Sequence, residues 1–496
     1  MWVTTRIVAA FSALVAAVSV SASNDKQQNA SAYNLSQLRD RLGSNGTKSF
    51  EIPTRLPNVS FEIPPSWGGY EPVSNKPNET RQIYFWMMPA TGDVGVNDFV
   101  IWFNGGPGCS SLSGILSEEG PLKLDPVTYV AKSNPYSWTN LTNMMWVDQP
   151  VGTGFSRGKA LNQTMEQVAE DFNGFLLNLY KDFPKLRGKN LWLMGESFAG
   201  KFIPYMAHQI YKNEKENMRA GIQLKGIGMN DAFFYDDVIG KELPAVQFAQ
   251  QNAKIMKLNQ SDVDQLVRQG KEIGIKNYVE DNLKYPPAGP LPVPAQFNSS
   301  KSVYSSMKKM AKKANPCFSP FNIPGPSPCH VDALGLDPTT EVPHKYNYFN
   351  RNPSVKAIIH ADNVSYVECS KKKPFDIMKD SKTGFPLNTV LPSVIEKSER
   401  TVVQHGTYDY IMLPNGSALA IQNMTWAGQQ GFQSRPNRTL LVDGKPAGTF
   451  HTERNLTLVM VDKASHMIPV YKPKAAYKLL QYVLGQISEE QLSTKD

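Results

Sequence analysis

The chain has 496 residues, of which 41% are hydrophobic and 19% are charged, so it can bury a large core as one elaborated domain or two. Its formal net charge is +8, and its lysine clusters at residues 308–313 and 371–373 stand without interleaved aromatic side chains. This pattern favours a solvated surface and argues against a nucleic-acid partner.

The first 23 residues are predicted to be a secretory signal peptide. Arg6 supplies the positive start, an apolar run covers residues 7–20, and small residues follow it. The run is short for a bilayer span and no later stretch is suited to one, so we expect no membrane anchor. Residues 24–55 are polar and form either a pro-segment or an N-terminal arm, and the sequence does not distinguish the two.

Glycosylation sequons are spread along the whole chain. Each one alone is weak evidence, but together they support export, either out of the cell or to the vacuolar lumen. The candidate asparagines are Asn29, Asn34, Asn45, Asn58, Asn78, Asn140, Asn162, Asn259, Asn298, Asn363, Asn415, Asn423, Asn437 and Asn455.

Strand-like runs alternate with helical stretches across residues 56–234, which we assign to the first part of a catalytic core. Pro184 ends the first predicted helix, and Pro204 should kink the second or shift its hydrogen bonding. The alternation predicts an α/β fold with a mostly parallel sheet. The predicted strands are 99–103, 144–147, 191–194 and 224–229, and the predicted helices are 164–183 and 201–213.

The pattern changes over residues 235–385, where lysine-rich helical segments mix with proline-rich loops. Core-like strands return at 401–404 and 456–461, so residues 386–496 are assigned to the second part of the core. The middle segment is therefore expected to be a largely helical cap that is inserted into one catalytic domain.

The most informative stretch is Gly195-Glu-Ser-Phe-Ala-Gly200, which follows an apolar run at 191–194. A short buried strand that runs through a Gly-x-Ser turn into a helix is the layout of the nucleophile elbow of an α/β-hydrolase. The turn needs small neighbours because the serine backbone is strained there. Ser197 is therefore the candidate nucleophile.

A serine hydroxyl needs a base to take its proton, and the base needs an orienting acid. In α/β-hydrolases the chain order is serine, acid, histidine, and each follows a strand. Asp409 follows the strand at 401–404, and His466 follows the strand at 456–461. The alternative base is His405, but it precedes Asp409 and would break this order. The alternative for Asp409 is an ordinary turn residue at a strand end.

Four cysteines in an exported chain predict two disulfides, with three connectivities open. Cys317 and Cys329 flank a proline-rich loop, which favours a local bridge and would leave Cys109 for Cys369. The spacing matches no zinc motif, and we expect neither a metal ion nor an organic cofactor.

Four separate motifs resemble the serine carboxypeptidases, which are secreted or vacuolar α/β-hydrolases of the wheat and yeast carboxypeptidase type. The resemblance covers residues 60–490 and is strongest to fungal secreted members. The motifs are Trp102-Phe-Asn-Gly-Gly-Pro-Gly-Cys-Ser-Ser111, Trp146-Val-Asp-Gln-Pro-Val-Gly-Thr-Gly-Phe-Ser156, Gly195-Glu-Ser-Phe-Ala-Gly-Lys-Phe-Ile-Pro204 and His466-Met-Ile-Pro469.

The resemblance implies the catalytic roles of the site. Ser197, Asp409 and His466 would form the triad, and the backbone N–H groups of Gly106 and Phe198 would form the oxyanion hole. The implied reaction releases single amino acids from peptide C-termini through an acyl-enzyme.

The family recognises the free carboxylate of the peptide, and this role falls on Asn104, Gly105, Glu118 and Glu196. Acidic side chains meet a carboxylate only if protons are shared, so activity is expected at acid pH. One alternative is Glu119 in place of Glu118. The other is that Glu118 is a solvated helix residue and that Glu196 only fills the elbow.

The resemblance also implies a specificity pocket and a disulfide. Trp102, Met412 and Met467 are its candidates for the pocket, with a lean towards hydrophobic C-terminal residues, although both methionines have an equal reading as core residues. The family pairs Cys109 with Cys369, which would tie the oxyanion loop to the cap.

Three functional readings follow from the sequence. The first is a carboxypeptidase with peptide or protein C-termini as substrate, as a monomer or a homodimer. The second is an acyltransferase or esterase on the same triad. The third is a non-catalytic secreted glycoprotein, which is disfavoured because no member of the triad is missing.

Overall fold

The computed structural model describes residues 34–125, 128, 130–159, 163–325, 348–370 and 384–494. Contacts divide the chain into Met1–Asn34 and a compact unit, Leu35–Asp496. The predicted signal peptide therefore lies outside the described residues.

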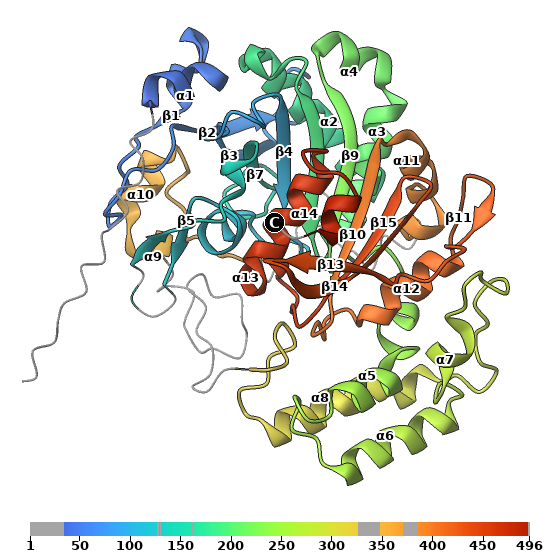
Figure 1. The fold of residues 1–496 in the computed structure, drawn as a ribbon. Coiled ribbons are helices and arrows are strands. Elements are labelled where there is room, and N and C mark those ends of the chain that lie inside the picture. The colour runs from blue at the N-terminus through green and yellow to red at the C-terminus, as the bar shows by residue number, and fades with distance from the viewer. Residues whose placement is uncertain are drawn as a thin grey trace, which may run out of the picture. The chain divides into compact units, whose positions relative to one another are not determined.

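A sheet of 11 strands forms the centre of the compact unit (Figure 1). Strands β7, β4, β8, β9, β10 and β15 are parallel neighbours in that order, and the strands outside them are antiparallel. In sheet order the strands are β1 (Glu51–Ile52), β2 (Ser66–Pro72), β3 (Gln82–Met88), β7 (Asn143–Asp148), β4 (Asp98–Phe103), β8 (Asn190–Glu196), β9 (Gln223–Asn230), β10 (Arg400–Gly406), β15 (Leu456–Val461), β14 (Lys445–Glu453) and β13 (Arg438–Val442).

Helices cover both faces of the sheet, and the strand β4 shows why. Side chains alternate between the faces of a strand, and a parallel strand covered on both faces is hydrophobic throughout. Phe99, Ile101 and Phe103 pack in one buried cluster with α2 (Met165–Asp182) and α3 (Ala199–Lys212). Val100 and Trp102 pack in a second cluster with α14 (Pro473–Val483).

The six predicted strands all fall within the parallel centre of the sheet, and the two predicted helices coincide with α2 and α3. Helix α3 contains Pro204 within its length. The antiparallel edge strands were not predicted. Outside residues 235–385, the unit also contains α1 (Leu35–Leu42), α4 (Glu214–Ala220), α11 (Leu391–Lys397), α12 (Pro414–Asn423), α13 (Ile468–Tyr471), the pair β5 (Leu122–Leu124) and β6 (Ala131–Ser133), and the pair β11 (Thr425–Trp426) and β12 (Gln429–Gln430).

The described residues of the segment 235–385 lie in two places, and the assignment of the whole segment to one cap remains a prediction. Its first helices lie below the sheet in Figure 1, where α5 (Ala245–Asn252), α6 (Gln260–Glu272) and α8 (Val303–Ala314) contact one another and α7 (Tyr278–Asn282) contacts α12. Its later helices, α9 (Tyr348–Arg351) and α10 (Pro353–Ile358), pack elsewhere.

Aromatic contacts hold this later part against the sheet. The Phe349 and Phe155 rings meet edge to face with centroids 5.4 Å apart, and the Tyr84 hydroxyl donates a hydrogen bond to the Ile359 carbonyl at 2.8 Å. Burial of aromatic surface on the β3 side of the sheet therefore separates residues 348–370 from the helical group. Sequence composition alone did not distinguish the two halves of the segment.

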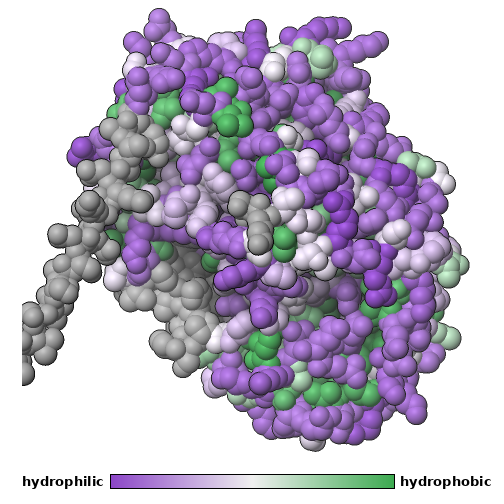
Figure 2. Space-filling model, viewed as in Figure 1, coloured by the Kyte–Doolittle hydropathy of each residue, from purple (hydrophilic) through white to green (hydrophobic). Residues whose placement is uncertain are grey.

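The face of the protein in Figure 2 is mainly hydrophilic, and its hydrophobic residues lie in separate patches. In the described ranges, no helix has both the length and the apolar content that a membrane span requires.

Glu71 is an acid buried at the edge of the core, on β2, and is 3% exposed. Burial, with a smaller contribution from the charge of Asp182, raises the pKa of Glu71 to about 8. A carboxyl group whose pKa is higher in the folded state stabilises the fold only while it is protonated. Its contribution is complete below the unfolded-state pKa and is lost as the pH rises towards 8.

We expect Glu71→Gln to remove this pH dependence, because an amide does not ionise. Between pH 4.5 and 7 the wild type should lose on the order of 3 kcal/mol more unfolding free energy than the variant. Urea unfolding at both pH values measures the difference. Glu170→Gln, an exposed position on α2, is the matched control. Equal pH dependence in all three proteins would contradict the assignment.

Candidate active site

Ser197 lies in a strained turn between β8 and α3, with a backbone φ of +59°. Its N–H donates to the Asn230 carbonyl at 3.0 Å, and its carbonyl accepts from the Phe233 N–H at 2.8 Å. A Cβ at Gly195 would lie 2.3 Å from the Phe103 carbonyl oxygen, so only glycine fits there. This is the geometry of a nucleophile elbow, which holds a serine at the carboxyl end of the sheet.

Asp409 and His466 meet in the loops after β10 and β15. His466 Nδ1 lies 2.9 Å from Asp409 Oδ2, and the Ile411 N–H donates to Asp409 Oδ1 at 2.7 Å. Both side chains are buried. Burial would raise the pKa of Asp409, but the nearby imidazoles of His466 and His405 lower it below its usual range. His466 Nε2 has no hydrogen-bond partner among the described residues and is available to accept a proton.

His405 is close to Asp409 but both of its ring nitrogens are occupied. Nδ1 lies 2.7 Å from the Ser417 hydroxyl, and Nε2 lies 2.7 Å from the Met412 carbonyl. Its Nε2 is 3.5 Å from Asp409 Oδ2, longer than the His466 contact. His405 therefore has no free nitrogen to act as a base.

The glycine loop after β4 lies directly against the elbow. A Cβ at Gly105 would lie 2.5 Å from the Phe198 backbone nitrogen and 2.7 Å from Ser197 Cβ. The next residue, Gly106, has a φ of +107°. The two backbone segments that would supply oxyanion donors are thus adjacent.

Asp148 anchors this glycine loop to the loop after β7. Its Oδ1 accepts from the Ser110 hydroxyl at 2.6 Å and the Ser111 N–H at 2.9 Å, and its Oδ2 accepts from the Phe155 N–H at 2.8 Å. Burial raises the pKa of Asp148 to about 6. The Asp in the Trp146–Ser156 motif is therefore the link between two motifs that are distant in sequence.

Asn104 holds two buried glutamates together. Its amide nitrogen donates to Glu118 Oε1 at 2.9 Å and to Glu196 Oε1 at 3.0 Å. The Trp102 indole N–H donates to Asn104 Oδ1 at 2.9 Å, which fixes the amide with its nitrogen towards the glutamates. The Oε2 atoms of Glu118 and Glu196 are buried without a hydrogen-bond partner among the described residues.

The glutamate pair favours a protonated state. Burial raises the pKa of Glu118. Burial, followed by the charges of Glu118, Glu119 and Asp231, raises the pKa of Glu196 well above its ordinary value. Two adjacent carboxyl groups in a buried site retain at least one proton at acid pH.

Glu119, the alternative to Glu118, faces away from Asn104. Its Oε1 accepts from the Trp146 indole N–H at 2.8 Å. Burial, and then the charge of Glu118, raises the pKa of Glu119 well above its ordinary value. Glu118 is the last residue of a short π-helical turn, Gly114–Glu118, and Glu119 is the residue that caps it. The two neighbouring side chains therefore reach different partners.

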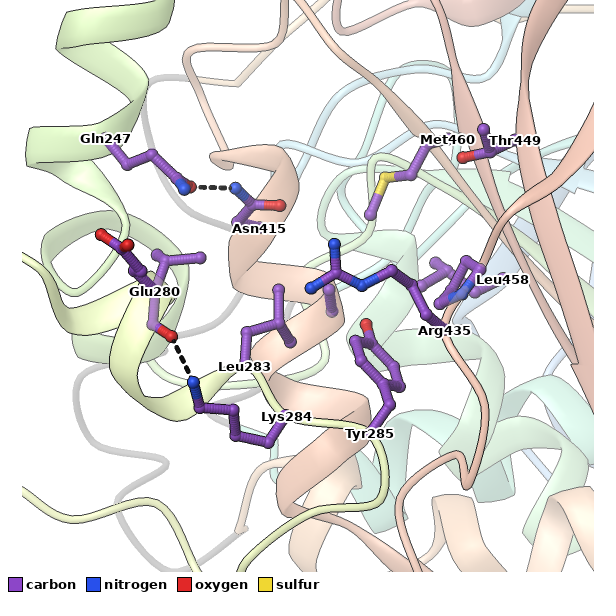
Figure 3. Close-up of a pocket in the computed structure, with 13 residues that line it drawn as sticks. Gln247, Glu280, Leu283, Lys284, Tyr285, Asn415, Arg435, Thr449, Leu458 and Met460 are labelled. Carbon is purple, nitrogen blue, oxygen red and sulfur yellow. Dashed lines mark hydrogen bonds between the residues drawn. The ribbon is translucent and has the colours of Figure 1, made fainter.

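The three pocket candidates occupy different environments. Trp102 is fully buried beneath Asn104, and Met412 is buried as well, with its carbonyl bonded to His405. Only Met467 is partly exposed. A pocket of about 550 Å³ lies instead between α7, α12 and β14, where Arg435 stacks over Tyr285 (Figure 3). None of the candidate catalytic residues lines it.

A disulfide joins Cys109 to Cys369 across 260 residues, which is the pairing that the resemblance implies. Two backbone hydrogen bonds flank it, from the Ser110 N–H to the Glu368 carbonyl at 2.7 Å and from the Ser370 N–H to the Gly108 carbonyl at 2.9 Å. Cys317 is disulfide-bonded. Cys329 lies outside the described residues.

Most of the sequon asparagines that the structure describes are exposed. Asn140, Asn415 and Asn423 are only partly exposed, and Asn29 and Asn162 lie outside the described residues. The exposed candidates are Asn34, Asn45, Asn58, Asn78, Asn259, Asn298, Asn363, Asn437 and Asn455.

Two neighbours of the site were not predicted from the sequence. Phe321, which follows α8 in the chain, contacts His466 with ring centroids 5.4 Å apart. The Phe321 carbonyl also accepts a hydrogen bond from the His466 N–H at 3.1 Å. Asp231 follows β9 and lies beside Asp409 and His405. A strand followed by Asn-Asp was the one available signal for Asp231.

The strand order, the elbow serine and the buried acid–histidine pair define the protein as an α/β-hydrolase. The family model for serine carboxypeptidases matches residues 57–486. The chain therefore belongs to the serine carboxypeptidase family, a family of serine-type hydrolases, and the expected family is confirmed.

Individual relatives agree with this membership. A probable serine carboxypeptidase of Arthroderma benhamiae is 36% identical over 477 residues, covering 91% of this chain and 89% of that protein. Serine-type carboxypeptidase F of Aspergillus niger is 34% identical, covering 89% and 88%. The crystal structure of a prohormone-processing carboxypeptidase from Saccharomyces cerevisiae shares the fold, with a TM-score of 0.69 and 21% identity over 89% of this chain and 97% of that one.

Replacing both Cys109 and Cys369 by serine should destabilise the protein and loosen the glycine loop. Closing so long a loop restricts the unfolded chain, and we expect a loss of about 2–5 kcal/mol in unfolding free energy. Labelling of Ser197 by a fluorophosphonate should slow as well, because the loop packs against the elbow. Unchanged unfolding in urea together with an unchanged labelling rate would contradict this role.

Proposed function

We propose that this protein is a serine carboxypeptidase that releases single amino acids from the C-termini of peptides at acid pH. The observation that carries the proposal is the buried Asn104–Glu118–Glu196 cluster, one residue from the elbow serine. Such a cluster suits a ligand carboxylate more than an internal peptide segment.

The proposed reaction uses the triad in two halves. Ser197 Oγ attacks the carbonyl carbon of the last peptide bond while His466 Nε2 accepts the hydroxyl proton. The N–H groups of Gly106 and Phe198 stabilise the negative oxygen. His466 then gives the proton to the leaving amine, which departs as a free amino acid. Water attacks the acyl-enzyme, with His466 again as the base, and restores Ser197.

Carboxylate recognition would depend on shared protons. The Asn104 amide and the Gly105 N–H would donate to the terminal carboxylate of the peptide, and Glu118 and Glu196 would share protons with it. As the pH rises, both glutamates ionise and repel the substrate. Binding should therefore weaken with increasing pH. Partly exposed Met467 remains the candidate for contact with an apolar side chain.

We also propose that the protein acts in an oxidising compartment, outside the cell or in the vacuolar lumen. The signal-like N-terminus, the disulfides and the exposed sequons support this location. No metal or organic cofactor is part of the proposed mechanism.

The direct test is mass spectrometry of a peptide library incubated with the protein at about pH 5. We expect stepwise loss of single C-terminal residues, no trimming of C-terminally amidated peptides, and no activity in Ser197→Ala. The order of loss among side chains measures the expected hydrophobic preference.

Other results would redirect the assignment. A protein that reacts with a fluorophosphonate but trims no peptide would contradict the carboxypeptidase proposal, and transfer of an acyl group to an added alcohol would identify an acyltransferase or esterase. A protein whose Ser197 does not react with the probe would be non-catalytic.

The double variant Glu118→Gln, Glu196→Gln should bind its peptide substrate with an affinity that no longer depends on pH. In the wild type, KM for a peptide should rise roughly tenfold or more between pH 5 and 8, because a like charge costs about 1.4 kcal/mol or more. In the variant both amides stay neutral, so KM should change little. Glu119→Gln, which removes a buried acid bonded to Trp146, is the control and should keep the rise.

A further inference from the structure

Asp231 connects the elbow loop to the loop of the catalytic acid. It follows Asn230, whose carbonyl accepts from Ser197, and its own N–H donates to the Gln404 carbonyl at 2.8 Å. Its backbone has a φ of +46°, which is uncommon for a residue other than glycine. Backbone strain of this kind persists where the surroundings determine it.

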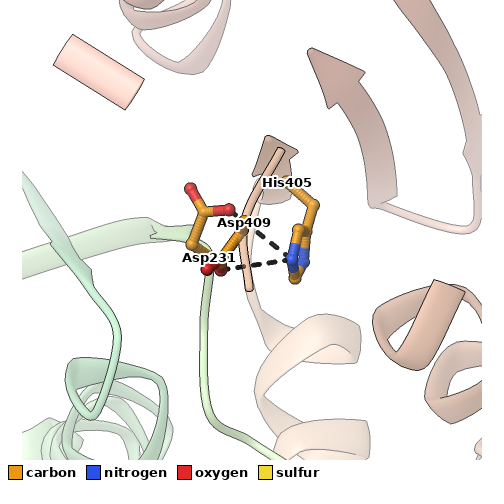
Figure 4. A group of neighbouring side chains, drawn as sticks. All are labelled: Asp231, His405 and Asp409. Carbon is orange, nitrogen blue, oxygen red and sulfur yellow. Dashed lines mark ion pairs between the residues drawn. The ribbon is translucent and has the colours of Figure 1, made fainter. Parts of the chain in front are cut away.

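The side chain of Asp231 is fully buried and points to the triad acid (Figure 4). Oδ1 accepts from the Gly406 N–H at 2.8 Å, three residues before Asp409. The second oxygen, Oδ2, is buried and has no hydrogen-bond partner among the described residues. Oxygen atoms of Asp231 and Asp409 and a nitrogen of His405 all lie within 4.8 Å of one another.

Two buried carboxylates at this distance cannot both stay ionised without strong repulsion. Asp409 is the one that carries the charge, since it accepts hydrogen bonds from His466 and from the Ile411 N–H. Among the described residues, Asp231 accepts a hydrogen bond from the Gly406 N–H, and His405 Nε2 lies farther off, 3.5 Å from its Oδ1. Burial and then the charge of Asp409 raise the pKa of Asp231 well above its ordinary value.

The third member of the cluster is hydrogen-bonded outside the pair. His405 Nε2 lies 2.7 Å from the Met412 carbonyl, which can only accept, so Nε2 carries a proton and donates there. Nδ1 lies 2.7 Å from the Ser417 hydroxyl. Both nitrogens of His405 therefore have hydrogen-bond partners, and Nε2 also lies 3.5 Å from Asp231 Oδ1 and from Asp409 Oδ2.

We propose that Asp231 is a positioning residue of the triad: a neutral carboxylic acid that fixes the Gly406–Asp409 loop through Oδ1 and donates a hydrogen bond from Oδ2 to the Asp409 carboxylate. The inference rests on the triad roles proposed above, and it adds a residue that those roles do not include.

The hydrogen bond has a consequence for acid catalysis. It disperses part of the negative charge of Asp409, so a positively charged His466 is held less strongly. The imidazole then stays neutral, and able to act as a base, to lower pH. This matches the acid conditions under which the glutamate pair would bind a carboxylate.

Other titratable groups face the pair from every surrounding element, and each one is common to the wild type and the variants below. They are His405 on β10, His466 after β15, Glu196 on β8, Tyr235 after β9 and Tyr304 on α8.

The test is the pH dependence of Ser197 labelling by a fluorophosphonate, measured for wild type, Asp231→Asn and Asp231→Ala. The asparagine keeps an acceptor for Gly406 and a donor for Asp409. The acidic limb of its pH profile, which is the fall in labelling rate at low pH, should therefore match that of the wild type. The alanine lacks the donor, and its acidic limb should move to higher pH by about 1–2 units, the equivalent of one charge-assisted hydrogen bond. Asp237→Asn, an exposed acid of the same segment, is the matched control.

Each other outcome overturns the inference. An unshifted acidic limb in Asp231→Ala would leave Asp231 a merely structural role. A limb that moves to lower pH in both variants would show that Asp231 is ionised. Stoichiometric metal in the purified protein that is lost in Asp231→Ala would assign the three side chains to an ion.

A second readout is independent of the alanine variant, in case that variant does not fold. The infrared difference spectrum between wild type and Asp231→Asn should show loss of one neutral carboxylic acid carbonyl band at pH 5 to 7, and its absence would contradict the protonated state. Labelling needs no peptide, so a protein that labels but trims nothing refutes the proposed function while still testing Asp231. A protein that does not label refutes both.

Discussion

The hydrogen-bonded register of the parallel strands is the constraint on which the site depends. Strands β4, β8, β9, β10 and β15 end at the same edge of the sheet, so the residues that follow them meet although they are far apart in sequence. Asn104, Ser197, Asp231, Asp409 and His466 each follow one of these strands within a few residues. A slip of one residue would turn every side chain to the other face of the sheet.

Burial of acidic groups gives the site its chemical character. Acidic residues of the site differ in their hydrogen-bond donors: Asp409 has N–H donors enough to remain ionised, whereas Glu196 and Asp231 lie among other acids with few donors. A low-dielectric site magnifies such small differences in donor count. An acidic side chain can therefore be ionised at one position of the site and protonated at a neighbouring one.

The sequence predicted the parts of the fold whose signal is local. Continuous apolar runs such as 99–103 mark strands covered on both faces, and the Gly195–Gly200 turn marks the elbow. The edge strands β13 and β14 were missed because their half-buried pattern depends on pairing with distant partners. Asp231 was missed because a turn aspartate after a strand is ordinary in sequence, and only the fold brings it to Asp409. The division of residues 235–385 depends on where Phe349 and Tyr366 are buried, which composition does not reveal.

The disulfide between Cys109 and Cys369 makes completion of the site a late event in synthesis. The glycine loop is translated 260 residues before the cysteine that fastens it. The elbow serine is translated 212 residues before its acid, Asp409, and 269 residues before its base, His466. A chain that is still emerging, or one whose thiols are reduced, holds the loop by hydrogen bonds alone. If the protein is exported as proposed, oxidation would act as a form of latency, because the hydrolase would be fully assembled only after leaving the reducing compartment.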